Sequence, residues 1–109
     1  MRASTSAFCW KALFGTTASH AACLFEKLGE NKAKAYFQSL KDNDIQVEAG
    51  NKQVAIKVSQ GLLAFGLTDT DDAIIEVEAG KPVKIIFPDD GPDGMGALFI
   101  PNTLAIIKD

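Results

Sequence analysis

Two kinds of apolar pattern alternate along this chain, and this alternation constrains the fold more than any other feature. Ala21, Leu24, Phe25 and Leu28 follow the i, i+3, i+4, i+7 spacing of one helix face. In contrast, residues 62–67 form a continuous apolar run that is typical of a strand buried on both sides. Helices are expected over 16–28, 33–40, 51–60 and 69–79, and strands over 45–48, 62–67, 83–87, 97–100 and 103–107.

The order of these elements predicts an α/β fold with a small, mostly parallel sheet and flanking helices. Strands that alternate with helices are typical of parallel sheets, because parallel neighbours need a crossover connection. At 109 residues the chain is expected to be one domain. Residues 1–12 form an atypical start, since they show no clear period and make a poor first strand.

Charge, cysteine content and hydropathy exclude several classes of function. The net charge of −3 argues against general nucleic-acid binding, which needs clustered Lys and Arg. Cys9 and Cys23 are too few for a disulfide framework, so buried or unpaired thiols are expected. No apolar run approaches the roughly 20 residues that span a bilayer, and Lys11 interrupts the first one. We therefore expect a cytoplasmic location without membrane insertion.

The most distinctive local feature is the sequence from Gly66 to Asp72, where an expected strand leads into an expected helix. Its hydroxyl and carboxylate groups would lie at the carboxyl end of a strand, where open α/β sheets bind ligands. The alternative is structural: Asp69 or Thr70 caps the helix, and the acidic residues that follow complement its dipole.

A second feature is the sequence from Phe14 to His20. A Gly followed by hydroxyl residues at a helix start offers free N–H groups and side-chain donors to an anion. Ordinary capping by Thr16 or Thr17 is the alternative. A phosphate-binding Walker loop is excluded, because no Gly-Lys-Ser/Thr follows.

Metal and catalytic sites are not expected. His20 and Cys23 could share a helix surface, but zinc needs three or four ligands and no second Cys/His pair exists. A calcium loop beginning at Asp69 would need Gly and Glu where Ile74 and Gly80 stand. No cofactor is expected, and no arrangement of nucleophile, base and orienting group can be assigned around His20.

Three segments in register resemble a known family. Leu13 to Ala22, Gly66 to Ala73, and Ile100 to Lys108 occur in an order similar to the solute-binding proteins of iron(III)-type ABC importers. These belong to the type 2 periplasmic binding proteins. The resemblance covers residues 13–109 and corresponds to most of the second of two lobes. The family's first strand of this lobe is expected to be replaced by residues 1–11.

The resemblance implies a cleft between two lobes, of which this chain would supply one wall. The residues implied to line it are Gly15, Thr16, Thr17, Ser19, His20, Asn51, Thr68, Asp69 and Asp71. The paired tyrosines that hold iron in classical members have no match, so an anionic or hydroxyl-bearing solute is expected instead. The family is periplasmic, in contrast to the location expected from the sequence itself.

Two functional hypotheses follow, and enzymatic activity is expected of neither. The first is a truncated solute-binding lobe that binds its ligand weakly, because half a cleft encloses little of it. The second is a homo-oligomeric interaction module without a transport role. A lobe without its partner exposes a sheet edge and an apolar face, which predicts a homodimer, with residues 1–11 pairing across subunits.

Overall fold

The α/β class is confirmed by a computed structural model that describes residues 6–9, 15–101 and 105–107. The elements, in chain order, are β1 (Ser6–Cys9), α1 (Thr16–Leu28), α2 (Glu30–Asp42), β2 (Gln46–Glu48), α3 (Asn51–Ser59), β3 (Phe65–Leu67) and α4 (Thr70–Glu78). The four helices lie close to their expected positions. None of them, within the described residues, is long and apolar enough to cross a bilayer.

The strands pair in the order β2-β1-β3, and both pairings are parallel. Phe8 lies opposite Val47 on one side of β1 and opposite Leu67 on the other. The expectation that residues 1–12 lack a strand is therefore wrong, because Ser6–Cys9 forms the central strand. Both of its pairing partners in this structure lie within the same chain.

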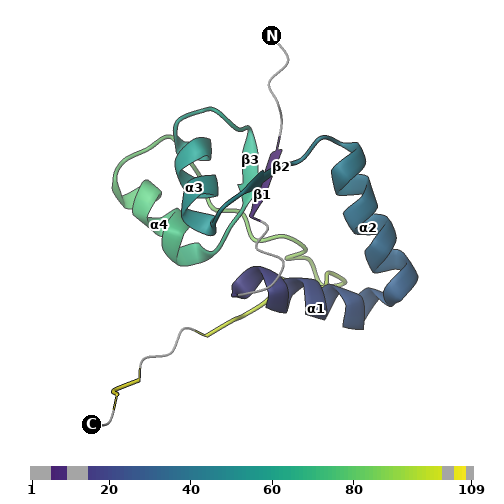
Figure 1. Ribbon diagram of the computed structural model, residues 1–109. Helices are drawn as coiled ribbons and strands as arrows, with labels where there is room; N and C mark the ends of the chain where they lie inside the picture. The colour runs from purple at the N-terminus through teal and green to yellow at the C-terminus, as the bar shows by residue number, and fades with distance from the viewer. Residues whose placement is uncertain (1–5, 10–14, 102–104, 108–109) are drawn as a thin grey trace.

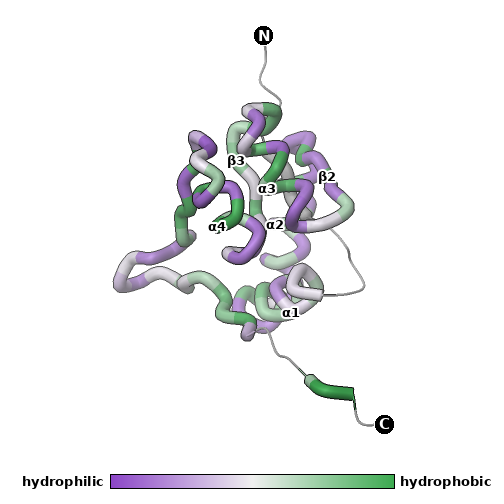
Figure 2. The backbone as a smooth tube through the Cα atoms, turned by 90° about the vertical axis from the view of Figure 1, so that its left-hand side faces the viewer, coloured by the Kyte–Doolittle hydropathy of each residue, from purple (hydrophilic) through white to green (hydrophobic). Residues whose placement is uncertain are grey.

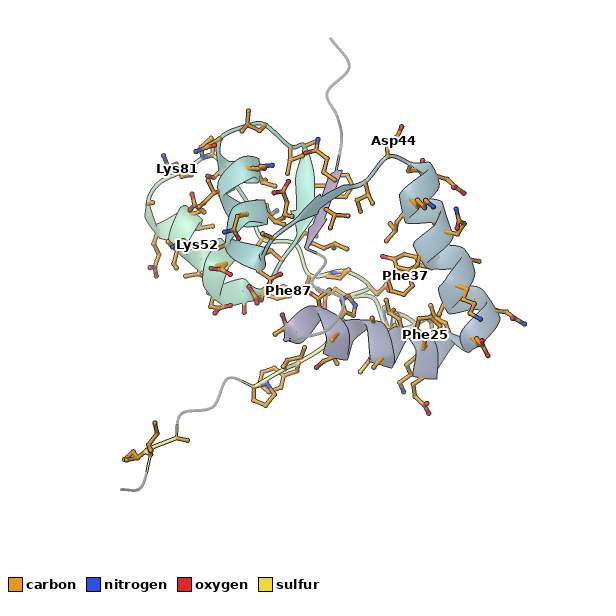
Figure 3. The ribbon with its side chains drawn as sticks, viewed as in Figure 1. Phe25, Phe37, Asp44, Lys52, Lys81 and Phe87 are labelled. Carbon is orange, nitrogen blue, oxygen red and sulfur yellow. The ribbon has the colours of Figure 1, made fainter. Side chains whose placement is uncertain are left out.

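The helices lie on two sides of the strands (Figure 1). On one side, α1 and α2 form a pair in which the rings of Phe25 and Phe37 stack with centroids 5.9 Å apart (Figure 3). Gly29, with φ of 77°, allows the sharp turn between them, since L side chains rarely adopt that conformation. On the other side, α3 contacts all three strands and α4 packs beside it.

Little apolar surface is buried among the described residues. Leu24 and Ala33 are buried on α1 and α2, and Val54, Ala55 and Leu63 are buried on and just after α3. The expected strand 62–67 is shortened to three residues and is not buried, since the side chains of Leu62 and Phe65 remain 61% and 59% exposed.

The chain after α4 differs most from expectation. The strands expected at 83–87 and 97–100 are wrong: these residues form no regular structure, and neither do residues 105–107. Residues 103 and 104 lie outside the described residues. The backbone N–H of Val83 donates to the Lys81 carbonyl (2.8 Å) in a tight turn, and prolines 82 and 88 each lack a backbone donor. Within the described residues, 83–87 pair with no strand of the sheet.

Candidate functional site

Three helices begin beyond the carboxyl ends of the three strands. Each parallel strand is followed by a helix, so the N-termini of α1, α3 and α4 lie beyond the carboxyl ends of β1, β2 and β3. The order β2-β1-β3 also makes β1 a switch point, because the chain proceeds to one side of it and then to the other. Open α/β sheets bind ligands in the crevice at such a point.

The capping interpretation of these helix starts is not supported. The N-cap residues are Gly15, Gly50 and Asp69, and in the described part of the chain no side chain donates or accepts a capping hydrogen bond at any of the three. The expectation that Thr16 or Thr17 caps α1, and that Asp69 or Thr70 caps α4, is therefore wrong. The polar side chains instead contact one another across the helix starts.

Asp69 is the centre of these contacts. Its Oδ2 accepts a hydrogen bond from Asn51 Nδ2 and a long one from Thr16 Oγ1 (3.4 Å). Asn51 Nδ2 also lies 3.0 Å from Thr16 Oγ1, and Thr68 Oγ1 donates to the Asn51 carbonyl at 3.0 Å. One residue from each helix start thus joins a single polar cluster, Thr16, Asn51 and Asp69, which links segments far apart in the sequence.

The second oxygen of Asp69 makes this cluster incomplete. Asp69 Oδ1 is shielded from solvent and has no hydrogen-bond partner among the described residues. An acceptor in this state costs roughly 1–3 kcal/mol when it is fully buried. The described residues thus leave one acceptor of the cluster without a hydrogen-bond partner.

The electrostatics of the cluster are acidic. Burial raises the pKa of Asp69, the amide of Asn51 opposes that shift, and the carboxylates of Asp71 and Asp72 raise the pKa further. One carboxylate oxygen from each of these three residues lies within 4.8 Å of the other two. They are the groups in the described structure that could hold a hard cation, since carboxylate oxygen is the preferred ligand of such ions.

A large open cavity extends from this cluster. It measures about 990 Å³ and continues along α3 and α4 to residues 82–88 and 96–100. Its polar end is formed by Thr16, Thr17, His20, Asn51, Thr68, Asp69, Thr70 and Asp71. Its remaining walls are mostly apolar, among them Val54, Leu63 and Phe87.

Most of the residues expected to form the cleft lie together here. Seven of the nine line the cavity, and the two exceptions are Gly15 and Ser19, which are both exposed and lie outside its walls. His20 is half-buried, and burial lowers its pKa, so it is neutral near pH 7. Cys23, by contrast, is exposed with a free thiol, which agrees with the expectation of buried or unpaired thiols.

Two contributions to the site were missed by sequence reasoning. Asp72 was assigned only to the helix dipole, yet its carboxylate lies beside that of Asp69. Its position three residues after Asp69, one helical turn away, was the available signal. The apolar wall from residues 82–88 and 96–100 was missed because strands were expected at 83–87 and 97–100.

Comparison with known proteins identifies no relative of this chain. The chain matches no protein-family model, no curated protein and no solved structure. The resemblance to a solute-binding lobe therefore depends on its sequence motifs alone.

Proposed function

We propose that this chain is a ligand-binding domain that binds a hydroxyl-bearing small molecule at the carboxyl end of the sheet, where α1, α3 and α4 begin. The observation that carries the proposal is the unpaired, shielded Oδ1 of Asp69. A ligand hydroxyl would donate to this oxygen and accept from the free N–H groups of the helix starts, which lack side-chain caps. Thr17 and His20 line the same end of the cavity and would contact the rest of the ligand.

Of the two solute classes expected from the sequence, the geometry favours the hydroxyl-bearing one. An anion near the helix starts would gain from their dipoles, but it would also lie beside Asp69, Asp71 and Asp72. At such distances the repulsion between like charges opposes the partial charge of a helix end. A neutral polyol benefits from the same donors and acceptors without that repulsion.

The arrangement also suits the resemblance to one lobe of a type 2 periplasmic binding protein. In that interpretation, residues 13–109 supply one wall of a cleft, and the polar cluster faces the solute. The cavity is open to solvent, so the proposed affinity is weak, with a Kd of about 1 mM corresponding to roughly −4 kcal/mol. An importer role and a periplasmic location belong to the same proposal.

The proposal is tested by NMR titration of the labelled chain with glucose, myo-inositol, inorganic phosphate, citrate and Ca²⁺. We expect a polyol to shift the amide signals of Thr16, Asn51 and Asp69 with a millimolar Kd, while phosphate and citrate do not. Asp69→Asn should weaken that binding at least about tenfold, because a donor replaces the unpaired acceptor.

Ser19→Ala is the matched control. Ser19 lies on the first turn of α1 but outside the cavity, so its removal should leave the affinity unchanged. Shifts caused only by the anions would contradict the proposal, and so would a polyol affinity that Asp69→Asn leaves intact. A response to Ca²⁺ alone would assign the acidic cluster to a cation instead.

A further inference from the structure

The hydrogen-bonding side chains occupy only one end of the cavity. Beyond this polar end, the walls follow α3 and α4 to residues 82–88 and 96–100. Among the described residues that line this further part, Glu76 and Lys84 carry the charges, and aliphatic and aromatic side chains make up most of the rest. The cavity thus joins a polar end to a part whose walls are mostly apolar.

Two segments far apart from the polar cluster contribute apolar side chains to these walls. Val77 on α4 is 41% exposed, and Phe87 in the irregular segment after α4 is 54% exposed. In that segment, the hydrophobic stretches 85–87 and 97–100 are separated by a hydrophilic turn at 89–94 (Figure 2). Both hydrophobic stretches line the cavity, whereas the acidic turn lies outside its walls.

The volume of the cavity also exceeds what a simple polyol needs. At about 990 Å³ it lies at the upper end of the roughly 300–1,000 Å³ range of small-molecule sites, which enclose most of a drug-sized ligand. A polyol bound at the polar cluster would leave the apolar walls in contact with water. A ligand with an apolar chain beside its hydroxyl groups would cover those walls and gain affinity with each methylene group that it buries.

We propose that the ligand is an amphiphile, with a hydroxyl-bearing head group at the polar cluster and an aliphatic chain along the apolar walls. This inference rests on the proposed function, because its head group is the hydroxyl-bearing ligand of Asp69 and the helix starts. The apolar lining and the volume carry the added part, independently of the unpaired oxygen of Asp69. The chain of the ligand would contact Val77 and Phe87.

The test is an NMR titration of the labelled full chain with methyl β-glucoside and hexyl β-glucoside, below the concentration at which the hexyl compound forms micelles. The two compounds share a head group and differ in the length of the alkyl chain. We expect both to shift the amide signals of Thr16, Asn51 and Asp69, and the hexyl compound alone to shift those of Val77 and Phe87. The hexyl compound should bind at least about tenfold more tightly, which the burial of about two methylene groups suffices to supply.

Val77→Ser and Phe87→Ser separate the chain of the ligand from its head group. Each should weaken binding of the hexyl compound at least about threefold and leave the methyl compound unaffected, since neither residue belongs to the polar cluster. The two positions lie in different segments, so one variant remains informative if the other fails to fold. Ile75→Ser is the matched control, because Ile75 lies on α4 and is 56% exposed but lies outside the cavity walls. It should leave both affinities unchanged.

Equal affinities for the two glucosides would overturn the inference and leave the proposed function intact. Binding of neither compound would overturn the inference, and together with a failure of glucose and myo-inositol to bind it would overturn the proposed function too. The inference would also fail if the hexyl compound bound without shifting the cluster signals. An affinity advantage that Ile75→Ser removes, or that Val77→Ser and Phe87→Ser both leave unchanged, would place the chain on another surface and overturn it as well.

Discussion

Replacing Asp69 with Asn should make the protein more stable while it weakens ligand binding. The Asn carbonyl oxygen can occupy the place of Oδ2 and still accept from Thr16 and Asn51. Its amide nitrogen then takes the place of the unpaired oxygen and can donate to the neighbouring Asp72 carboxylate. The variant thus removes a shielded, unpaired acceptor and one of three adjacent negative charges.

The expected gain is about 1 kcal/mol in the free energy of unfolding. An unsatisfied acceptor costs about 1–3 kcal/mol when fully buried, and the low end applies because the Asp69 side chain is only half-buried. For a domain of this size, 1 kcal/mol raises Tm by about 4–8 °C. Urea unfolding followed by far-UV circular dichroism at pH 7 measures the difference directly.

The pH dependence supplies a second, independent readout. Because the folded-state pKa of Asp69 is raised, the folded chain binds this proton more tightly than the unfolded chain. Its contribution to stability is therefore fully present below the ordinary value of 3.8 and is lost as the pH rises through the raised pKa. The advantage of Asp69→Asn should accordingly be largest at neutral pH and shrink as the pH falls toward 3.8.

Asp71→Asn removes the same charge from the same helix and is the matched control. Asp71 is exposed, so its replacement should change the free energy of unfolding by less than about 0.5 kcal/mol. If Asp69→Asn is less stable than the native chain at pH 7, Asp69 stabilises the helix start and the reasoning fails. A gain of equal size at pH 7 and pH 4 would also refute it.

Three further predictions concern the cluster, the core and the cavity wall. Asn51→Ala should cost about 1–2 kcal/mol by urea unfolding and raise the pKa of Asp69 further in an NMR titration, because its amide is the group that lowers that pKa. Val54→Ala should cost about 2 kcal/mol, since Val54 is fully buried, whereas Val47→Ala at an exposed position should cost less than about 0.5 kcal/mol; equal effects would contradict the assigned core. The lowered pKa of His20 means that its contribution to stability is present above its ordinary value of 6.5 and is lost as the pH falls through the lowered pKa, so His20→Gln should flatten that part of the profile.

The helices could be predicted from the sequence because their signals are local. The stripe from Ala21 to Leu28 and the stop at Gly29 depend on neighbours within a few residues, and α1 ends where they indicate. The turn after α2 is equally local, with Asp44 at a positive φ that Asp tolerates. These elements need little from the rest of the chain to be recognised.

The strands could not be predicted as well, because pairing decides them. Ser6–Cys9 shows no alternation, yet it lies between β2 and β3 and pairs with both. Conversely, Val83 to Phe87 has the composition of a strand but pairs with none of the three described strands. Strand preference depends on the available partners more than on the residue types, so the pattern alone misassigned both segments.

Most residues of the candidate site could be predicted from the sequence, but their hydrogen bonds to one another could not. Asp69 stands at the N-cap of α4, where a side chain commonly caps a helix with an interaction worth about 1 kcal/mol, and Thr16 is the first residue of α1. Neither forms a cap, and both side chains instead join Asn51 in the cluster across the helix starts. The local preference for side-chain capping is therefore overridden by tertiary contacts at the carboxyl ends of the strands. Such conflicts are concentrated at functional sites. Together with the unpaired Oδ1, the uncapped helix starts support a binding role for this edge, because a ligand hydroxyl could satisfy donors and an acceptor that the chain itself leaves free.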